Sequence, residues 1–200
     1  AKEKSEPPPL AYDLTALQRE ANTRLSFSAQ KTLSVLQGLY ERHKLVSYPR
    51  TDSRYITRDM VPTLRDRLKA VAASRLHGRI AELLAGELAP GKRLVDDAKV
   101  RDHHAILPTE ERADPARLGP DERALWEMIV ARFVAVLCPP YRYRSITLFT
   151  EVAGESFVSH GVQVIEAGWK AVEGAGEEKE GAEGEEEAAS PQDLAARRQG

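Results

Sequence analysis

The spacing of apolar residues changes at Pro139-Pro140, and this change constrains the fold more than any other feature of the sequence. Before it, apolar side chains recur every three to four residues, as on amphipathic helices. From Arg144 to Val152 they alternate as in a strand, Gly154-Glu155 predicts a turn, and strand-like residues continue up to Gly168-Trp169. We therefore predict an α+β chain that is mainly α, with a β-rich C-terminal segment.

The helical part divides at residues that favour caps and breaks. Helices are predicted at about residues 13–25, 28–40, 57–71, 79–88 and 120–138. Asp13 and Ser28 are predicted N-caps of the first two. The last helix has the most continuous apolar stripe, which predicts that it lies in the core. On the third helix, the solvated face is expected to carry Arg58, Arg65, Arg67 and Lys69.

Composition at the two ends of the chain suggests domain limits. Pro7-Pro8-Pro9 predicts that residues 1–12 are a linker, because a proline run is stiff and extended. Residues 173–187 are rich in Glu, with Gly and Ala, so residues 173–200 are expected to be a disordered acidic insert or tail. A helical domain over 13–139 and a β-rich domain over 140–172 remain. Because the chain starts without Met and breaks off at Gly200, we expect it to be an excised piece of a longer protein.

Charge and cysteine content narrow the protein class. The sequence contains neither an apolar run that could span a bilayer nor a secretion signal, which predicts a soluble cytoplasmic protein without a membrane partner. The single cysteine, Cys138, argues against an internal disulfide and a multi-cysteine zinc site. Residues 172–200 carry nine acidic and three basic side chains, so the remainder is mildly basic despite a net charge of -2. That balance permits a polyanionic partner.

The segment Leu45–Tyr55 is the first candidate for chemistry, since it combines a phenol, a guanidinium, hydroxyls and a carboxylate. We predict a strand that ends at Tyr48, because Pro49 offers no backbone donor. In an extended segment Tyr48 and Arg50 would face the same side. A phenol with a pKa near about 10 needs a cationic neighbour to act as a nucleophile, and Arg50 could supply it while Asp52 holds a neighbouring group in place. On these residues alone, a core tyrosine followed by a polar turn is the open alternative.

The second candidate is the loop that contains His103-His104. Adjacent residues in an extended segment point to opposite sides, so the two imidazoles form a poor chelating pair. One imidazole could face a phosphate as a donor or proton carrier while the other packs on Ile106 and Pro108. A purely structural role for both is the alternative.

A third segment imitates a nucleotide-binding motif. Gly86 to Lys92 has the spacing of a P-loop, but Arg93 stands where Ser or Thr should bind magnesium, and Pro90 removes a cradling amide. We therefore predict no ATP site here.

The first two motifs together resemble a known active site. Ser47–Tyr55 and His103–Thr109 are similar to the active-site motifs of type IA DNA topoisomerases, in the version with proline after the tyrosine and two histidines that resembles topoisomerase III. Leu17–Ala21 and Phe27–Thr32 resemble the helices that lead into the tyrosine-bearing domain, and Gly161–Trp169 resembles a strand of the β-rich gate.

This resemblance, which covers about residues 14–172, implies a mechanism. Tyr48 would attack a backbone phosphorus of single-stranded DNA and form a 5′-phosphotyrosine link without ATP. Arg50 and His103 would act on the scissile phosphate, and Asp52 would orient one of them. The other candidate supporting or DNA-binding residues are Thr51, Ser53, Arg54 and His104.

The resemblance also implies that parts of such an enzyme lie outside this sequence. The family's magnesium-binding acidic triad is on a separate Toprim domain, and the domain that guides single-stranded DNA and the zinc modules are missing as well. We expect the fragment alone to be inactive. Its expected cofactor is Mg²⁺, and its expected partners are the remaining domains of the same chain and the DNA of the nucleoid, mainly in single-stranded form.

Two other readings remain open. The chain could be a non-catalytic helical DNA-binding module that inserts its basic helix from Thr57 into a groove, or an interaction domain that uses its β segment and acidic tail.

Overall fold

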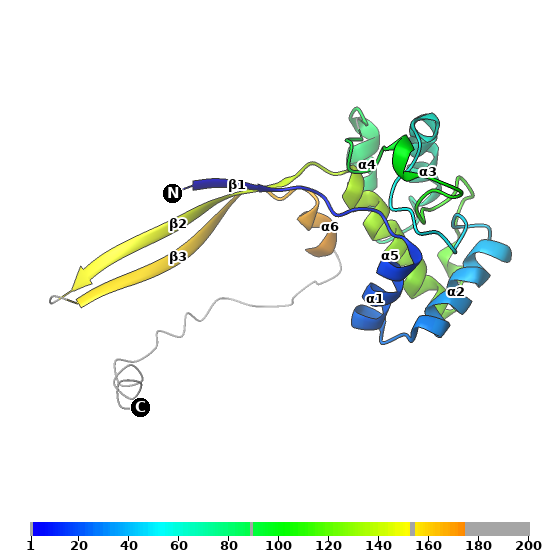
Figure 1. Cartoon of the computed structure of the whole chain (residues 1–200), viewed down its shortest axis with the longest axis horizontal. Helices are drawn as coiled ribbons and strands as arrows, with labels where there is room; N and C mark the ends of the chain where they lie inside the picture. The colour runs from blue at the N-terminus through cyan, green and yellow to red at the C-terminus, as the bar shows by residue number, and fades with distance from the viewer. Residues whose placement is uncertain (1, 89, 153–154, 175–200) are drawn as a thin grey trace.

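The computed structural model describes residues 2–88, 90–152 and 155–174, and it shows a helical body from which a long β arm extends (Figure 1). The elements, in chain order, are β1 (Lys2–Glu6), α1 (Leu14–Leu25), α2 (Ala29–Glu41), the 3₁₀ helix η1 (Arg58–Thr63), α3 (Leu64–Ala70), α4 (His77–Ala85), the 3₁₀ turns η2 (Asp97–Lys99) and η3 (Pro115–Arg117), α5 (Pro120–Leu137), β2 (Tyr141–Val152), β3 (Glu155–Glu166) and α6 (Lys170–Gly174). This arrangement confirms the predicted α+β class.

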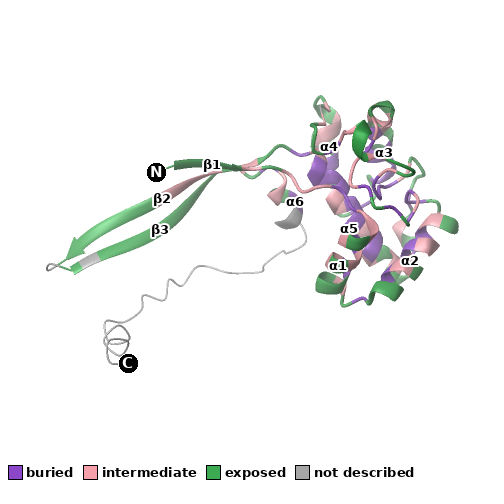
Figure 2. Ribbon diagram, in the orientation of Figure 1, coloured by how far each residue is buried: buried purple, intermediate pink, exposed green. Residues whose placement is uncertain are grey.

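Helix α5 forms the centre of the body, as its apolar stripe predicts. Trp126 and Phe133 on this helix are fully buried, and α1, α2 and α4 pack around it (Figure 2). Pro120 starts the helix, where a missing N–H costs nothing, and the Glu122 carboxylate accepts a hydrogen bond from the Gly119 N–H at 3.1 Å. The burial of its apolar side chains helps to hold the body together.

The predicted caps of the first two helices are confirmed. The Asp13 carboxylate accepts a hydrogen bond from the Ala16 N–H at 2.6 Å, and the Ser28 hydroxyl accepts one from the Lys31 N–H at 3.1 Å. Both side chains satisfy a backbone donor that the helix itself leaves unpaired. The two helices meet at Ser26, which has a left-handed backbone conformation with φ 56°.

The third predicted helix differs from the sequence expectation in two ways. Its first part is the 3₁₀ helix η1, because Pro62 lacks the N–H that an α-helical turn would use, and only Leu64–Ala70 is α-helical. The prediction that Arg67 lies on a solvated face is wrong. The Arg67 side chain is buried, donates a hydrogen bond to the Pro108 carbonyl at 2.6 Å and pairs with Glu110 at 2.8 Å.

The first twelve residues contain more structure than the expected linker. β1 lies antiparallel to β2, which pairs with β3 to give the sheet order β1-β2-β3. Charged side chains support the pairing, since Arg144 contacts the Glu3 carboxylate at 3.1 Å. Ala11 and Tyr12 then enter the core. The proline run gave no sign that β1 would pair, because its partner residues in β2 are more than a hundred positions away.

The β arm returns to the body through a tight turn at Gly168. This residue has a φ of 50°, and a Cβ atom added there would lie 2.4 Å from the Pro140 carbonyl oxygen. Only glycine fits both conditions without strain. The turn leads into α6, which the sequence did not predict and whose Val172 is buried against the body. The predicted hairpin turn lies largely, and the acidic tail almost wholly, outside the described residues.

In the described part of the chain, no helix is long and apolar enough to cross a membrane.

Candidate active site

The Tyr48 motif is an extended loop, and the strand predicted to end at Tyr48 is reduced to a single bridge between Val46 and Pro108. Burial nevertheless alternates along it. Thr51 and Ser53 are buried, whereas Arg50 and Asp52 are exposed and Tyr48 is partly exposed. This alternation is typical of an extended segment with one face on the core. Tyr48, Arg50 and Asp52 are therefore on the outward side of the loop.

Hydrogen bonds join the Tyr48 loop to the His103 loop. The Ser47 N–H donates to the Leu107 carbonyl at 2.8 Å, and the Ser47 hydroxyl donates to the Ala105 carbonyl at 3.0 Å. The same hydroxyl accepts a hydrogen bond from the Leu107 N–H at 3.0 Å. Since Ser47 is only 7% exposed, these bonds replace water for backbone groups that would otherwise be buried without partners. They fix the position of one loop relative to the other.

The phenol ring of Tyr48 lies against the imidazole of His103. The ring centroids are 4.1 Å apart with an angle of 31° between the planes. Tyr40, from the last part of α2, approaches the Tyr48 ring edge-on at 5.7 Å and 87°. Contacts of this kind orient a ring through its quadrupole. The structure thus brings together Tyr48 and His103, which are 55 positions apart in the sequence.

The two histidines have different surroundings. His103 is exposed, while His104 is half-buried with its Nδ1 at 2.7 Å from the Ala105 carbonyl oxygen. Burial lowers the pKa of His104, and the nearby Arg67 guanidinium acts in the same direction. His104 is therefore neutral at pH 7 and donates through Nδ1–H, which suits a structural group better than one that carries protons.

Three of the candidate supporting residues have internal partners. The Thr51 hydroxyl donates to the His103 carbonyl at 3.2 Å and accepts a hydrogen bond from the Ser53 N–H. The Ser53 hydroxyl donates to the Lys99 carbonyl at 3.0 Å, and Arg54 Nε donates to the Ala11 carbonyl at 3.0 Å. These contacts hold the loops in shape. A direct contact of any of the three with DNA remains a prediction, as does the orienting role of Asp52.

Sequence reasoning missed Tyr40, Ser47 and Arg67. Ser47 lies within the motif but reads as a polar residue at a strand end, and Tyr40 reads as part of a helical stripe. Their roles depend on partners in another loop or helix. A buried arginine in the middle of a short helix, beside the His103 loop, leaves no signal in the local pattern.

Among the residues that the structure describes, no three His, Cys, Asp or Glu side chains are grouped so that they could hold a metal ion. These residues therefore do not fit a magnesium site.

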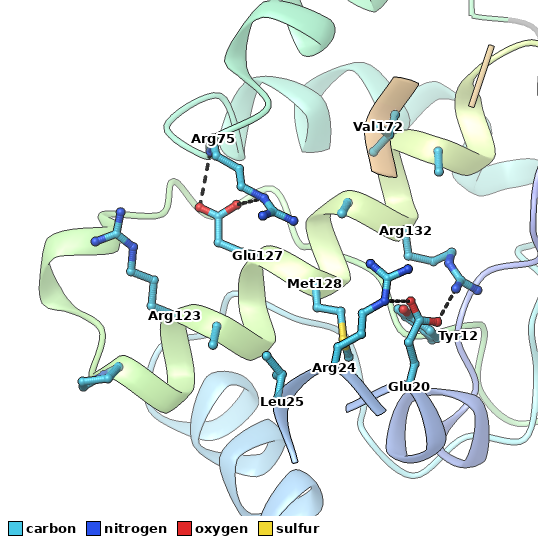
Figure 3. Close-up of a pocket in the computed structure, with 14 residues that line it drawn as sticks. Tyr12, Glu20, Arg24, Leu25, Arg75, Arg123, Glu127, Met128, Arg132 and Val172 are labelled. Carbon is cyan, nitrogen blue, oxygen red and sulfur yellow. Dashed lines mark hydrogen bonds and ion pairs between the residues drawn. The ribbon is translucent and has the colours of Figure 1, made fainter. Parts of the chain in front are cut away.

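A cavity of about 930 Å³ lies away from Tyr48, between α1 and α5 (Figure 3). Arg132 lies 4.2 Å above the ring of Tyr12 and pairs with Glu20, which also pairs with Arg24 at 3.1 Å. Burial raises the pKa of Glu127, which accepts a hydrogen bond from the Arg75 N–H. None of the predicted site residues lines this cavity, and most of its charged groups pair with one another: Arg24 and Arg132 with Glu20, and Arg75 with Glu127.

Comparison with known proteins gives consistent results. A protein-family model described as DNA topoisomerase matches residues 1–195. "DNA topoisomerase 3" of Bacillus licheniformis is 50% identical over 162 residues, which is 81% of this chain and 22% of that protein. "DNA topoisomerase 3" of Bacillus subtilis is 48% identical with the same coverage. The chain thus spans about a fifth of the length of these curated relatives.

A solved structure shares the fold. The full-length topoisomerase I from Thermotoga maritima, in a monoclinic crystal form, superposes with a TM-score of 0.62 over 86% of this chain and 28% of that one, at 24% sequence identity. The helical body with its β arm is therefore an arrangement already seen in an experimental structure.

Proposed function

Because the chain belongs to the DNA topoisomerase family, in its type IA, topoisomerase III-like branch, we propose that Tyr48 is the nucleophile that cleaves and reseals one DNA strand. The observation that carries this proposal is the stacking of Tyr48 on His103 at 4.1 Å, within two loops that are hydrogen-bonded to each other. A core tyrosine would not need an exposed histidine against its ring or an exposed arginine two residues later.

The proposed step exchanges one phosphoester for another. The Tyr48 phenol oxygen attacks a backbone phosphorus and loses its proton, while the bond from that phosphorus to the 3′ oxygen breaks. The leaving oxygen takes up a proton and becomes the free 3′-hydroxyl of the upstream fragment, and the downstream fragment stays joined to Tyr48 through its 5′ phosphate. The reverse attack by the hydroxyl reseals the strand. Because a phosphodiester is kept throughout, no ATP is needed.

The neighbouring side chains suit this step. Arg50 is an exposed guanidinium on the same side of the loop as Tyr48, where it can bind phosphate oxygens with two parallel hydrogen bonds and stabilise their charge in the transition state. His103 is exposed and lies against the phenol ring, so its ring nitrogens can carry a proton close to the reacting oxygens. Asp52 would orient one of these two groups.

The rest of the apparatus would come from a longer protein. We propose that residues 13–139 act as the tyrosine domain and 140–172 as part of the gate, and that a Toprim domain of the same chain binds the magnesium ion that such enzymes use. The 22% coverage of the relatives supports this. The complete enzyme would act on single-stranded DNA of the bacterial nucleoid, in the cytoplasm, to relax negative supercoils or decatenate. The fragment alone would be inactive.

The alternative of a groove-inserting basic helix has less support. The segment after Thr57 is a 3₁₀ helix followed by a seven-residue α-helix, and Arg67 on that helix points into the body. A continuous basic face, which such a reader needs, is therefore interrupted.

The test is covalent capture of a single-stranded oligonucleotide by the full-length enzyme with magnesium, stopped with detergent. An oligonucleotide labelled at its 3′ end should give a labelled protein band, since the downstream fragment stays bound to the protein through its 5′ phosphate. One labelled at its 5′ end should release a free labelled fragment. Tyr48→Phe should lose the band, with Tyr40→Phe as the matched control that keeps it. An adduct that persists in Tyr48→Phe would refute the assignment.

A further inference from the structure

A second, smaller cavity of about 390 Å³ lies beside the Tyr48 loop and is unused by the chemistry described above. Its lining comes from both active-site loops and from the segment before α1: Leu10, Asp52, Ser53, Arg54, Tyr55, Ala98, Lys99 and Arg101. A volume near the lower end of the range for small-molecule sites suits a single nucleotide better than a folded partner.

The cavity is close to Tyr48, because some of its lining residues follow Tyr48 within a few positions along the chain. Arg50 and Asp52 are exposed on the outward side of the loop, and Asp52 and Arg54 reach the cavity. On the other loop, Arg101 lies only two residues before His103. Arg54 is six positions after Tyr48, so the two residues are at most about 20 Å apart even if the chain between them is fully extended. The cavity therefore lies within a few nucleotides of a phosphate held at Tyr48.

The lining combines positive charge with an aromatic ring. The lining includes three cationic side chains, Arg54, Lys99 and Arg101, and one carboxylate, Asp52, so it carries an excess of positive charge. Lys99 Nζ lies 4.5 Å from the centre of the Tyr55 ring, 3.4 Å from its hydroxyl and 3.2 Å from the Asp96 carboxylate. These contacts hold the Tyr55 ring in place on the cavity wall. Cations beside an aromatic platform are the usual means of binding single-stranded nucleic acid.

We propose that this cavity binds one nucleotide of the strand that Tyr48 cleaves, with its phosphate on Arg101 and Lys99 and its base or sugar against Tyr55. The inference rests on the proposed function, because it assumes that the bound polymer is DNA. Arg54 is less free to move toward a phosphate, since its Nε already donates a hydrogen bond to the Ala11 carbonyl. The site adds a hold on the strand away from the scissile phosphate, so that the strand keeps its register when the bond is broken.

The first test measures binding of a fluorescent single-stranded oligonucleotide to the full-length enzyme that carries Tyr48→Phe, over a range of salt concentrations. Arg101→Ala should lower the affinity at least about fivefold and reduce the slope of log affinity against log salt by about 0.7, as for one lost phosphate contact. Arg117→Ala removes an equally exposed arginine outside the cavity and should leave the slope unchanged. Equal slopes for Arg101→Ala and the unsubstituted protein would refute the phosphate site.

The second test maps the nucleotide. Oligonucleotides with one abasic site, moved stepwise from the cleaved bond, are assayed for covalent adduct with Tyr48 present. One position within a few nucleotides should show an adduct loss of about fivefold or more, and Tyr55→Leu should abolish that position's effect while retaining cleavage. A flat scan with normal adduct would refute the cavity site and leave the proposed function intact. An enzyme that forms no covalent adduct would refute the proposed function. The salt dependence of binding in the first test would still show whether the cavity binds a phosphate.

Discussion

Two aromatic rings contact the ring of Tyr48: the imidazole of His103 is tilted by 31° from its plane, and the ring of Tyr40 is nearly perpendicular to it. An imidazole against a phenol can act in two ways. It can orient the ring, or it can exchange a proton with the groups that react beside it. Because His103 is exposed and His104 is half-buried against the Ala105 carbonyl, the proton transfer proposed above concerns His103.

Substitution of His103 separates these two roles. His103→Phe keeps a ring beside Tyr48, whereas His103→Ala removes it. If proton transfer matters, both variants should form the covalent adduct about 10²- to 10⁴-fold more slowly, while still binding single-stranded DNA. The check is the rate of adduct formation in the full-length enzyme, with His160→Phe on the β arm as the control. Near-normal rates for His103→Phe would show that the ring only orients Tyr48.

Two short motifs and their resemblance to a known family pointed to Tyr48, Arg50 and His103 as candidate site residues, and the roles of these residues remain predictions. The sequence did not reveal the residues that support them. Arg67 was assigned to solvent because its spacing on a helix matches a polar face, yet it donates to Pro108 inside the body. Its partner Pro108 is 41 positions away in the sequence, and the pattern of neighbouring residues gives no information about a contact so far along the chain.

Among the elements, the two active-site loops lack regular strands and depend on side-chain hydrogen bonds instead. The Ser47 hydroxyl donates a hydrogen bond to the Ala105 carbonyl and accepts one from the Leu107 N–H. Thr51 and Ser53 repeat the arrangement further along the loop. Rigid loops allow Tyr48 and His103 to meet without a sheet beneath them.

Ser47→Ala should therefore destabilise the 200-residue chain. The substitution leaves the buried Leu107 N–H without a partner, whereas the Ala105 carbonyl keeps its bond from His104, and we expect a loss of about 1–3 kcal/mol in the free energy of unfolding. Urea denaturation followed by circular dichroism would measure it. Ser34→Ala, at an exposed position on α2, should change the value by less than about 0.5 kcal/mol. Equal stability of the two variants would mean that water replaces the lost bonds.

Helices were predicted better than loops for a physical reason. Caps such as Asp13 and Ser28 and the stripe of α5 are local signals, and the structure confirms them. The strand expected at Tyr48 failed because a ladder needs a partner, and the His103 loop supplies only one bridge. β1 was missed for the converse reason, since its partner is β2, far along the chain.

For the molecule as a whole, the junction between body and arm depends on one small residue. Pro139 and Pro140 end α5 and start the arm, and the returning chain passes them at Gly168 so closely that their carbonyl oxygens would touch any Cβ atom. Trp169 then donates to the Glu6 carbonyl at 3.0 Å and ties β1 to the same place. The arm is thus anchored to α5 on its way out and on its return.

Gly168→Ala should loosen this junction. The left-handed backbone costs a non-glycine residue about 1–2 kcal/mol, and contact with two backbone carbonyls adds to it. The melting temperature of the chain should fall by several degrees. Gly78→Ala is the matched control, because nothing lies within 4 Å of its added Cβ and the helix should gain about 0.5–1 kcal/mol. A chain with Gly168→Ala that melts with the control would contradict the close approach.

The central claim is that Tyr48 carries the 5′ end of a broken DNA strand, and peptide mass spectrometry tests it most directly. The covalent adduct of the full-length enzyme is digested with nuclease and then with trypsin, which cuts after Lys44 and Arg50 and releases Leu45–Arg50 with Tyr48 as its only tyrosine. We predict that this peptide carries a residual nucleotide joined through its 5′ phosphate, and that fragmentation places it on Tyr48. A nucleotide on Ser47, or on a peptide from elsewhere in the protein, would contradict the account.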